Sequence, residues 1–258
     1  MFEGLPHLSC SEENTIFQLK LEHQTVKVCE NDTYRWLSMG GEYIQSIINL
    51  SDPSQVLLPY AQSMLLALTF TRKPRSILNL GSGCGTFERF FIKNYPEMSI
   101  TSVELNTDII EISKQFFYIP SEHPVINKSA EEFIESNKNK YDIIFCDLHD
   151  GTQHPDFIYQ VEFYNKIFNS LSENGTFVIN LFPGHEKQFL NYLLSARKVF
   201  RWQHLLEFDN YDNVLVYMHK QEPNICSSDV IVKELRNRMS IDLTPTIGRL
   251  TLLPVSVT

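Results

Sequence analysis

Two patterns of hydrophobic and polar residues divide the chain. Between residues 14 and 50, apolar positions alternate with polar ones, as at Phe17, Leu19 and Leu21, which is the two-residue period of half-buried strands. We therefore predict a small antiparallel β domain over residues 1–51, which is too small to be stable without packing against the rest of the chain. Turn-forming residues separate its predicted strands at residues 22–24, 31–32 and 40–41.

From residue 52 onward, short apolar runs alternate with segments of helical periodicity. Tyr60, Met64, Leu65 and Leu68 share one face of a first predicted helix. The elements that follow predict a mostly parallel sheet, because a helix separates each strand from the next. The predicted strands cover residues 76–81, 99–104, 125–126, 141–147 and 176–182, and the predicted helices cover residues 85–94, 107–117, 130–136, 160–171 and 185–199.

The last part of the chain departs from this alternation. Two strands predicted at residues 201–208 and 212–219 are joined by a turn, which indicates an antiparallel pair at one edge of the sheet. We therefore expect a nucleoside-binding α/β domain over residues 52–220. Residues 221–258 are expected to hold one helix, residues 228–239, and a tail that the pattern does not place.

A glycine turn follows the first of the parallel strands. The apolar residues 77–80 lead into Gly81, Gly83 and Gly85, and a helical pattern begins directly afterwards. A strand, a glycine turn and a helix bring backbone N–H groups close to a nucleotide-like ligand. Glu104 ends the next strand, nineteen residues after Gly85, where a carboxylate can accept hydrogen bonds from both hydroxyls of a ribose. The spacing therefore predicts a nucleoside site at this turn.

Two aspartates stand at the carboxyl end of the predicted strand 141–147. Asp147 closes the strand and Asp150 follows three residues later. Two carboxylates at such a strand end can hold a protonated amine and take from it the proton that it must lose before it attacks an electrophile. In the alternative interpretation, Asp147 caps a loop and residues 150–151 form a turn. Local spacing leaves both interpretations open.

Charge and hydropathy narrow the choice of partners. The chain of 258 residues has a net charge of −9, which argues against a nucleic-acid backbone or an anionic membrane as partner and is compatible with a cationic substrate. No stretch approaches eighteen apolar residues, and the first residues lack the pattern of a signal peptide. We therefore expect neither a membrane span nor a signal peptide.

The cysteines and loop histidines do not form a recognisable metal or disulfide motif. Five cysteines are scattered without a C-x-x-C pair, so we expect no zinc site, no disulfide framework and a reducing, cytoplasmic setting. Cys84 is interpreted as a small residue tolerated in the glycine turn, and Cys146 as a core residue. His149 and His154 lie close to the two aspartates, but loop histidines are usually solvated and we predict no metal site.

Several motifs, in register with the predicted elements, resemble the polyamine aminopropyltransferases, the spermidine synthase family. The resemblance runs from about Tyr34 to Leu181. Its most specific match is the run from Tyr141 to Asp150, which is similar to the family's Y-D-x-I-x-x-D-x-x-D, because general methyltransferases rarely carry the second aspartate. The other matches are residues 41–45, which end with Gln45, residues 60–62, the glycine motif 81–85 and Glu104.

The resemblance implies an α/β fold in which a small N-terminal antiparallel β domain precedes a Rossmann-like, methyltransferase-type doubly wound sheet. It implies a homodimer that transfers an aminopropyl group from decarboxylated S-adenosylmethionine, a co-substrate rather than a tightly bound cofactor, to putrescine or a similar amine, releasing methylthioadenosine. In this interpretation Asp147 accepts the proton of the amine, Asp150 holds the diamine, and Tyr60 and Gln45 line the diamine pocket. On the donor side, Glu104 holds the ribose, Ser129 and Ala130 lie beside the adenine, and the backbone of the glycine turn, at Gly81, Gly83 and Gly85, approaches the donor. Residues 148–158 form a lid over the site.

Three positions depart from the family's pattern. Cys84 stands where the family has the aspartate that binds the aminopropyl amine, Ser129 where it has an adenine-binding aspartate, and Gln62 where it has a glutamate. Each lost charged contact is worth about 1–3 kcal/mol, so we expect weaker binding of the decarboxylated donor or use of another donor. Two further hypotheses follow: a methyltransferase that uses intact S-adenosylmethionine, and a non-catalytic member of the family.

Overall fold

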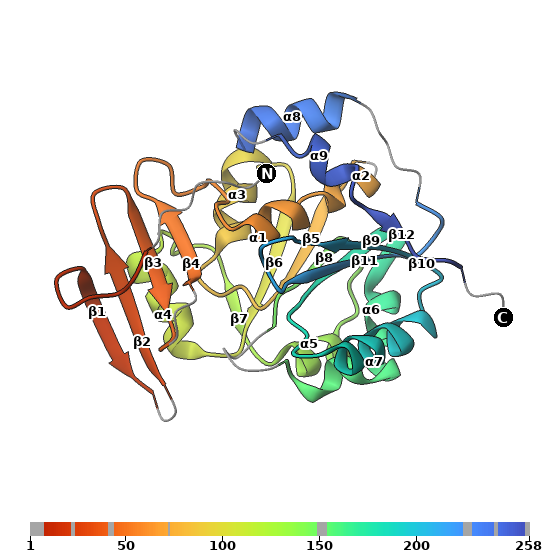
Figure 1. Cartoon of the computed structure of the whole chain (residues 1–258), viewed down its shortest axis with the longest axis horizontal. Helices are drawn as coiled ribbons and strands as arrows, with labels where there is room; N and C mark the ends of the chain where they lie inside the picture. Colours follow the sequence, from red (N-terminus) through yellow and green to blue (C-terminus); the bar gives the residue numbers. More distant parts are fainter. Residues whose placement is uncertain are drawn as a thin grey trace.

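The computed structural model describes residues 8–21, 24–40, 44–71, 73–148, 154–223, 229–239 and 242–255, whose strands form two sheets. Among these residues the smaller sheet has four antiparallel strands in chain order, drawn in red and orange in Figure 1. Burial alternates along the first of them, as the two-residue period predicts. The strands are β1 (Thr15–Lys20), β2 (Thr25–Glu30), β3 (Tyr34–Ser38) and β4 (Ile44–Asn49).

The larger sheet, within the described residues, has eight strands in the order β12-β10-β11-β9-β8-β5-β6-β7. The strands from β9 to β7 run parallel, whereas β11, β10 and β12 are each antiparallel to their neighbours. This confirms the predicted small antiparallel sheet followed by a Rossmann-like sheet. The strands are β5 (Ser76–Leu80), β6 (Ser99–Glu104), β7 (Val125–Asn127), β8 (Tyr141–Cys146), β9 (Leu171–Leu181), β10 (Trp202–Glu207), β11 (Val214–His219) and β12 (Thr251–Leu252).

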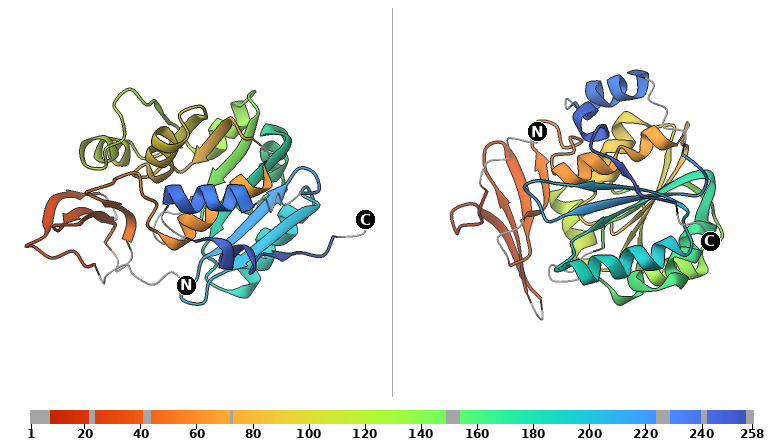
Figure 2. Two further views of the ribbon diagram at one scale, coloured as in Figure 1. Left: turned by 90° about the horizontal axis from the view of Figure 1, so that it is seen from above. Right: turned by 45° about the vertical axis from the view of Figure 1, so that its right-hand side comes forward.

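Helices cover both faces of the larger sheet (Figures 1 and 2). Ile143 and Phe145 of β8 pack in one apolar cluster with α1, α2, α3 and α8, while Ile144 and Cys146 pack in a second cluster with α5, α6 and α7. Burial on both faces explains the continuous apolar run of β8. The helices are α1 (Pro59–Met64), α2 (Ala67–Phe70), α3 (Thr86–Asn94), α4 (Thr107–Phe116), α5 (Ala130–Ser136), the 3₁₀ helix η1 (Asp156–Tyr159), α6 (Val161–Ser170), α7 (Glu186–Arg197), α8 (Asp229–Met239) and α9 (Thr244–Ile247).

A third apolar cluster joins the small sheet to the rest of the molecule. The small sheet contributes buried side chains from β2, β3 and β4, and α4 lies against them on the other side (Figure 1). A four-stranded sheet with one apolar face requires such a partner to be stable. The buried members of the cluster are Val26, Val28, Leu37, Ile48, Cys84, Ile109, Ile112 and Phe117.

Strand β9 differs from its prediction. It begins at Leu171 rather than at Thr176, so residues 172–175, which the prediction left between a helix and this strand, lie inside the strand. Leu171 pairs with Tyr141 whereas Thr176 pairs with Ile143, so four residues of β9 stand opposite one residue of β8. The sheet accommodates the extra residues as a bulge, which local turn signals cannot distinguish from a strand end.

The tail that the sequence pattern left unplaced adds to the larger sheet. After α9, the two residues of β12 pair with His204 and Leu205 of β10. This short strand extends the predicted antiparallel pair by one member. In the part of the chain that the structure describes, no helix has the length and apolar character needed to cross a membrane.

A disulfide joins Cys10 to Cys29, with their Cα atoms 5.8 Å apart. The expectation that the cysteines form no disulfide is therefore wrong for this pair. The reason lies in the strand pairing, because Thr15 of β1 stands opposite Cys29 and the chain before β1 is thereby brought alongside β2. Cys84 and Cys146 are free thiols and both are buried, as expected for Cys146 in a core strand.

Candidate active site

The glycine turn lies between β5 and α3 and touches the end of β8. Gly81 has φ +83°, and a Cβ at this position would lie 2.3 Å from the carbonyl oxygen of Asp147. Gly85 has φ +76°, and its Cβ would lie 2.1 Å from Ile119 Cδ1. Both positions therefore favour glycine for conformation. A side chain at residue 81 would also overlap with backbone, whereas one at residue 85 would have to displace the Ile119 side chain. Gly83 is different, since the nearest atom to a Cβ there is Ser46 Oγ at 3.9 Å.

Glu104 ends β6 and is hydrogen bonded to the glycine turn. Its Oε2 accepts from Gly83 N at 2.9 Å and its Oε1 accepts from Asn106 N at 3.0 Å. Burial raises the pKa of this carboxyl group, and the backbone N–H donors oppose that effect. Each oxygen keeps further acceptor capacity, so the carboxylate can serve a pair of hydroxyl donors beside the turn.

Asp147 directly follows β8 and faces the same region. Its backbone N–H donates to Leu80 O over 3.0 Å, which continues the pairing of β8 with β5 up to the glycine turn. Its half-buried carboxylate accepts from Asn180 Nδ2 at 2.9 Å. Burial raises the pKa of Asp147 to about 6, although the Asn180 hydrogen bond acts in the opposite direction. The group is thus a base that titrates just below neutral pH.

Tyr60 is near enough to Asp147 for the two groups to interact electrostatically. It lies in the first turn of α1, where Pro59 precedes it, and its side chain is half-buried. Burial, and second to it the charge of Asp147, raise the pKa of the Tyr60 phenol well above its usual value. Gln45 is half-buried on β4, next to Ser46, whose Oγ is the atom nearest to a Cβ built on Gly83. The structure therefore brings Tyr60, Asp147 and the glycine turn together.

Cys84 belongs to the glycine turn, and its thiol is enclosed by protein. Its side chain is fully buried in the cluster between the small sheet and α4. Burial raises the pKa of its thiol to about 12, although a hydrogen bond with Ser46 acts in the opposite direction. Cys84 is therefore a neutral core thiol, in agreement with its interpretation as a small residue in a tight turn.

Ser129 and Ala130 begin α5 beyond the end of β7. The Ser129 hydroxyl accepts from Glu132 N at 3.1 Å and the Glu132 carboxylate accepts from Ser129 N at 3.3 Å, a capping box that occupies the serine side chain. Ala130 is buried against the sheet. The preceding Lys128 N–H donates to Glu104 O over 3.2 Å, so this corner adjoins the carboxylate predicted to hold a ribose.

Three residues of the site were not identified from the sequence. Arg89 of α3 donates to the carbonyl oxygens of Pro53, Cys84 and Phe117. It thereby holds the glycine turn, through Cys84, to the segments before α1 and after α4. Asn180 of β9 binds Asp147, and Asn213 binds Asn180. The place of Asn180 near the carboxyl end of a predicted parallel strand was an available signal, since ligands bind beyond such strand ends.

His154 is buried, so its interpretation as a solvated loop residue is wrong. Its Nε2 accepts from Phe182 N at 2.7 Å, which places the ring proton on Nδ1, and Nδ1 then donates to Leu148 O over 2.6 Å. Both ring nitrogens are thereby engaged in holding the backbone beside Asp147. His149 and Asp150 lie outside the described residues, so the role predicted for Asp150 stays a prediction.

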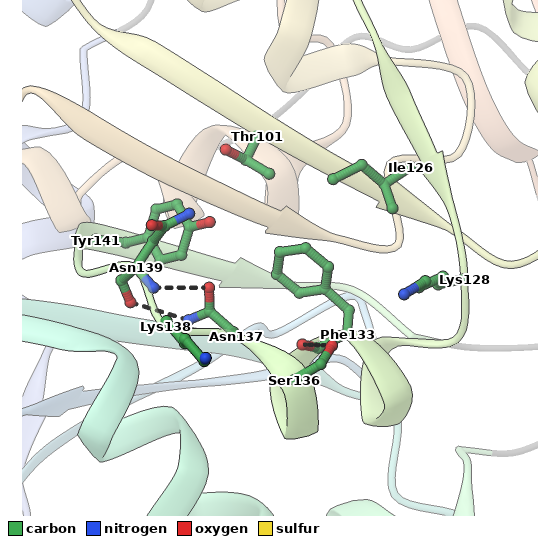
Figure 3. Close-up of a pocket in the computed structure, with 9 residues that line it drawn as sticks. All are labelled: Thr101, Ile126, Lys128, Phe133, Ser136, Asn137, Lys138, Asn139 and Tyr141. Atoms are coloured by element: carbon green, nitrogen blue, oxygen red, sulfur yellow. Dashed lines mark hydrogen bonds between the residues drawn. The ribbon is translucent and has the colours of Figure 1, made fainter.

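A cavity of about 500 Å³ lies apart from these residues, beside α5 and the start of β8 (Figure 3). None of the candidate site residues lines it. Its wall combines aromatic and amide side chains with two exposed lysines. The lining residues are Thr101, Ile126, Lys128, Phe133, Ser136, Asn137, Lys138, Asn139 and Tyr141.

Comparison with known proteins gives a consistent family. The spermine/spermidine synthase domain matches residues 60–204. The polyamine aminopropyltransferase of Chromobacterium violaceum is 27% identical over 232 residues, which cover 87% of this chain and 88% of that protein. The crystal structure of a probable spermidine synthase from Corynebacterium glutamicum has a TM-score of 0.70 at 21% identity and covers 85% of this chain and 86% of its own. A spermidine synthase in complex with the transition state analogue AdoDATO has a TM-score of 0.69 at 16% identity, and the match covers 93% of this chain and 85% of that protein.

The matched domain contains more than half of the chain, from α1 to β10, and includes Tyr60, the glycine turn, Glu104 and Asp147. The two structural relatives match the fold of this chain over most of their length. The resemblance noted from the motifs is thereby confirmed. The chain belongs to the spermine/spermidine synthase family, a family of enzymes that transfer alkyl groups other than methyl.

Proposed function

We propose that this protein transfers an aminopropyl group from decarboxylated S-adenosylmethionine to putrescine or a similar amine and releases methylthioadenosine. The observation that carries the proposal is the position of Asp147, a half-buried base whose pKa is raised to about 6, beside Tyr60 and in contact with the glycine turn. A base of this kind suits an amine nucleophile, which must be neutral when it attacks.

The reaction needs little beyond placement and one proton acceptor. The amine nitrogen attacks the propyl carbon next to the sulfonium, a C–N bond forms, and the C–S bond breaks with its electron pair going to sulfur. The proton of the attacking nitrogen passes to Asp147. In-line placement of the two substrates supplies most of the acceleration in such a displacement.

The remaining residues are proposed to hold the two substrates. Glu104 accepts hydrogen bonds from the ribose hydroxyls, and the backbone at Gly81, Gly83 and Gly85 approaches the donor. Ser129 and Ala130 lie beside the adenine of the donor, where the Ser129 hydroxyl is engaged in the N-terminal cap of α5. Tyr60 and Gln45 line the acceptor pocket. Asp150 holds the far amine of the acceptor, and the segment 148–158 is proposed to close over it.

Cys84 favours a second candidate function, methyl transfer from intact S-adenosylmethionine. A buried neutral thiol offers no charge to the amine of the decarboxylated donor. Without an aspartate there, the pocket does not select against the carboxylate of the intact donor by charge repulsion. Calorimetry with methylthioadenosine, S-adenosylmethionine and its decarboxylated form separates the two functions, and absence of binding by all three supports a non-catalytic protein.

The decisive assay is release of methylthioadenosine from the decarboxylated donor in the presence of putrescine. We expect turnover that depends on the diamine. Tight binding of intact S-adenosylmethionine, with no methylthioadenosine released in the presence of any diamine, would contradict the proposal and favour methyl transfer. Comparing putrescine with a monoamine of equal length tests whether the acceptor must carry a second, far amine.

We also propose that the protein is a cytoplasmic homodimer. The net charge of −9 suits a soluble setting with cationic small molecules as substrates. The Cys10–Cys29 disulfide argues in the other direction, because such bonds are rare in reducing compartments. Light scattering of the purified protein measures the oligomeric state, and alkylation of free thiols at the moment of cell lysis measures whether this bond is present in the cell.

A further inference from the structure

Two asparagines form a hydrogen-bonded chain that ends at Asp147. Asn180 Nδ2 donates to Asp147 Oδ1 over 2.9 Å, and Asn213 Nδ2 donates to Asn180 Oδ1 over 3.0 Å. Asn180 is 6% exposed and belongs to β9, the neighbour of β8, while Asn213 directly precedes β11, the neighbour of β9. The order of strands in the sheet therefore aligns three residues that are far apart in the sequence.

We propose that Asn180 and Asn213 are positioning residues for Asp147, and that Asn213 holds the Asn180 amide in the orientation that presents its NH₂ group to the carboxylate. The inference rests on the proposed function for its role in turnover. The hydrogen-bond chain itself can be tested without turnover.

The orientation of the Asn180 amide follows from donor and acceptor chemistry. An ionised carboxylate only accepts hydrogen bonds, whereas an amide has one end that donates and one that accepts. If Asn180 were flipped, its carbonyl oxygen would face Asp147 Oδ1 and its NH₂ would face the NH₂ of Asn213. Both contacts would then pair like with like. Asp147 therefore sets the orientation of the Asn180 amide, and Asn213 stabilises that orientation by donating to the Asn180 oxygen.

This arrangement has two consequences for Asp147. Its Oδ1 is held in place, which leaves Oδ2 to receive the proton of the substrate amine. The donated hydrogen bond also favours the ionised form, which burial disfavours. Tyr60 from α1 and Cys146 from β8 interact electrostatically with Asp147, but both have pKa values raised well above their usual range and are neutral where Asp147 titrates.

The test combines three variants with two measurements. Asn180→Leu removes the donor at similar volume, Asn213→Leu releases the Asn180 amide, and Asn213→Asp offers an acceptor where a donor stood. The first measurement is the pH dependence of kcat/KM for methylthioadenosine release. The second is a ¹³C NMR titration of the Asp147 carboxyl, assigned by its absence in Asp147→Asn. Thr176→Val, a buried position on β9 away from Asp147, serves as the matched control.

We expect Asn180→Leu to move the acid limb of the kcat/KM profile, and the titration midpoint of the Asp147 carboxyl group, upward by about one pH unit. Its kcat/KM should then fall about fivefold at pH 6, where the ionised fraction drops from about one half to about one tenth, and approach that of the parent at pH 9. Asn213→Leu should give a smaller shift. Asn213→Asp should give a larger shift than Asn213→Leu, because the new carboxylate adds negative charge near Asp147 and also draws the NH₂ of the Asn180 amide toward itself. Thr176→Val should move neither measurement.

Some outcomes would overturn the inference. An unchanged carboxyl titration in Asn180→Leu contradicts the role of that residue, and equal shifts in Asn213→Leu and Asn213→Asp contradict the orienting role of Asn213. If Asn180→Leu fails to fold, the two variants at the half-buried Asn213 still test the inference. If the carboxyl titration shifts in a protein that shows no aminopropyl transfer, the hydrogen-bonded chain of asparagines is supported and the proposed function is rejected. Failure of the inference and failure of the proposed function are therefore distinguishable.

Discussion

Single residues in this molecule act in pairs that are distant in the sequence, as Gly81 and Asp147 do in the candidate site. A Cβ on Gly81 would enter the space of the Asp147 carbonyl oxygen at 2.3 Å. Any side chain at residue 81 must therefore push the end of β8 away from the turn. The position of the proposed base thus depends on the absence of a side chain in the neighbouring glycine turn.

Replacing Gly81 by alanine should be costly for two reasons. The positive φ of +83° alone costs about 1–2 kcal/mol for a non-glycine residue, and the overlap with a backbone atom adds to it. Gly40→Ala is the matched control, since Gly40 has φ +82° but no atom closer than 3.7 Å to its Cβ. Urea denaturation should show a clearly larger loss for Gly81→Ala, and equal losses would show that the contact with Asp147 is not restrictive.

Asp147→Asn should abolish the proposed proton transfer. We expect kcat to fall about 10²–10⁴-fold, the usual contribution of a positioned base, with a small change in KM for the donor. The amide can still accept from Asn180 through its oxygen, so the fold around it is preserved. The methylthioadenosine assay measures the effect, and full activity in this variant would rule out Asp147 as the base.

At the scale of elements, α3 is the part that connects the others. Its buried Arg89 donates to Pro53 O at 2.7 Å in the link after the small sheet, to Cys84 O in the glycine turn, and to Phe117 O at 2.9 Å beyond α4. Burial lowers the pKa of Arg89 to about 10, which still leaves it charged at neutral pH. One guanidinium group thus fixes three segments relative to each other.

Arg89→Met should separate these segments. Three carbonyl oxygens lose a charged donor at once, and each buried unsatisfied group costs about 1–3 kcal/mol, so we expect a loss of at least about 3 kcal/mol in the free energy of unfolding. Lys93→Met on the same helix is the control, because its ion pair with Asp52 is solvent-exposed and worth less than about 1 kcal/mol. Similar losses in the two variants would contradict the anchoring role.

At the scale of the whole molecule, the buried His219 and the half-buried Asp147 make stability depend on pH in opposite directions. His219 is buried between His204 and Thr176, and burial lowers its pKa from 6.5 to about 3. The unfolded chain then binds more protons between these values, so stability is lost as pH falls from about 6.5 toward 3. Asp147 has its pKa raised from 3.8 to about 6, so the folded chain binds more protons and stability is lost as pH rises through that window.

The two effects offset each other between about pH 4 and pH 6. Removing the acid in Asp147→Asn should expose the histidine contribution, so that the free energy of unfolding rises with pH more steeply than in the parent by up to about 1.4 kcal/mol per pH unit. His219→Gln should change the slope in the opposite sense. Denaturation at several pH values measures both slopes, and parallel curves for the parent and Asp147→Asn would contradict the raised pKa.

The sequence was sufficient for features that depend on local pattern. The strand–turn–helix at residues 76–94, Glu104 at the end of its strand and the parallel sheet were all predicted from spacing and periodicity. Contacts across the sheet could not be predicted, because they depend on strand order. Asn180 meets Asp147, and Cys10 meets Cys29, only after the strands are paired. The bulge in β9 was missed for the same reason.

The two edges of the large sheet are formed by its shortest strands, with two residues in β12 and three in β7, among the strands that the structure describes. A short edge gives another chain few backbone groups with which to pair. The small sheet is different, because its edge strands β1 and β4 have six residues each, and half of the residues of β1 are exposed whereas none of those of β4 is. Copies of this chain that associate by adding strand to strand would therefore do so through β1, at the opposite end of the molecule from β12 (Figure 1).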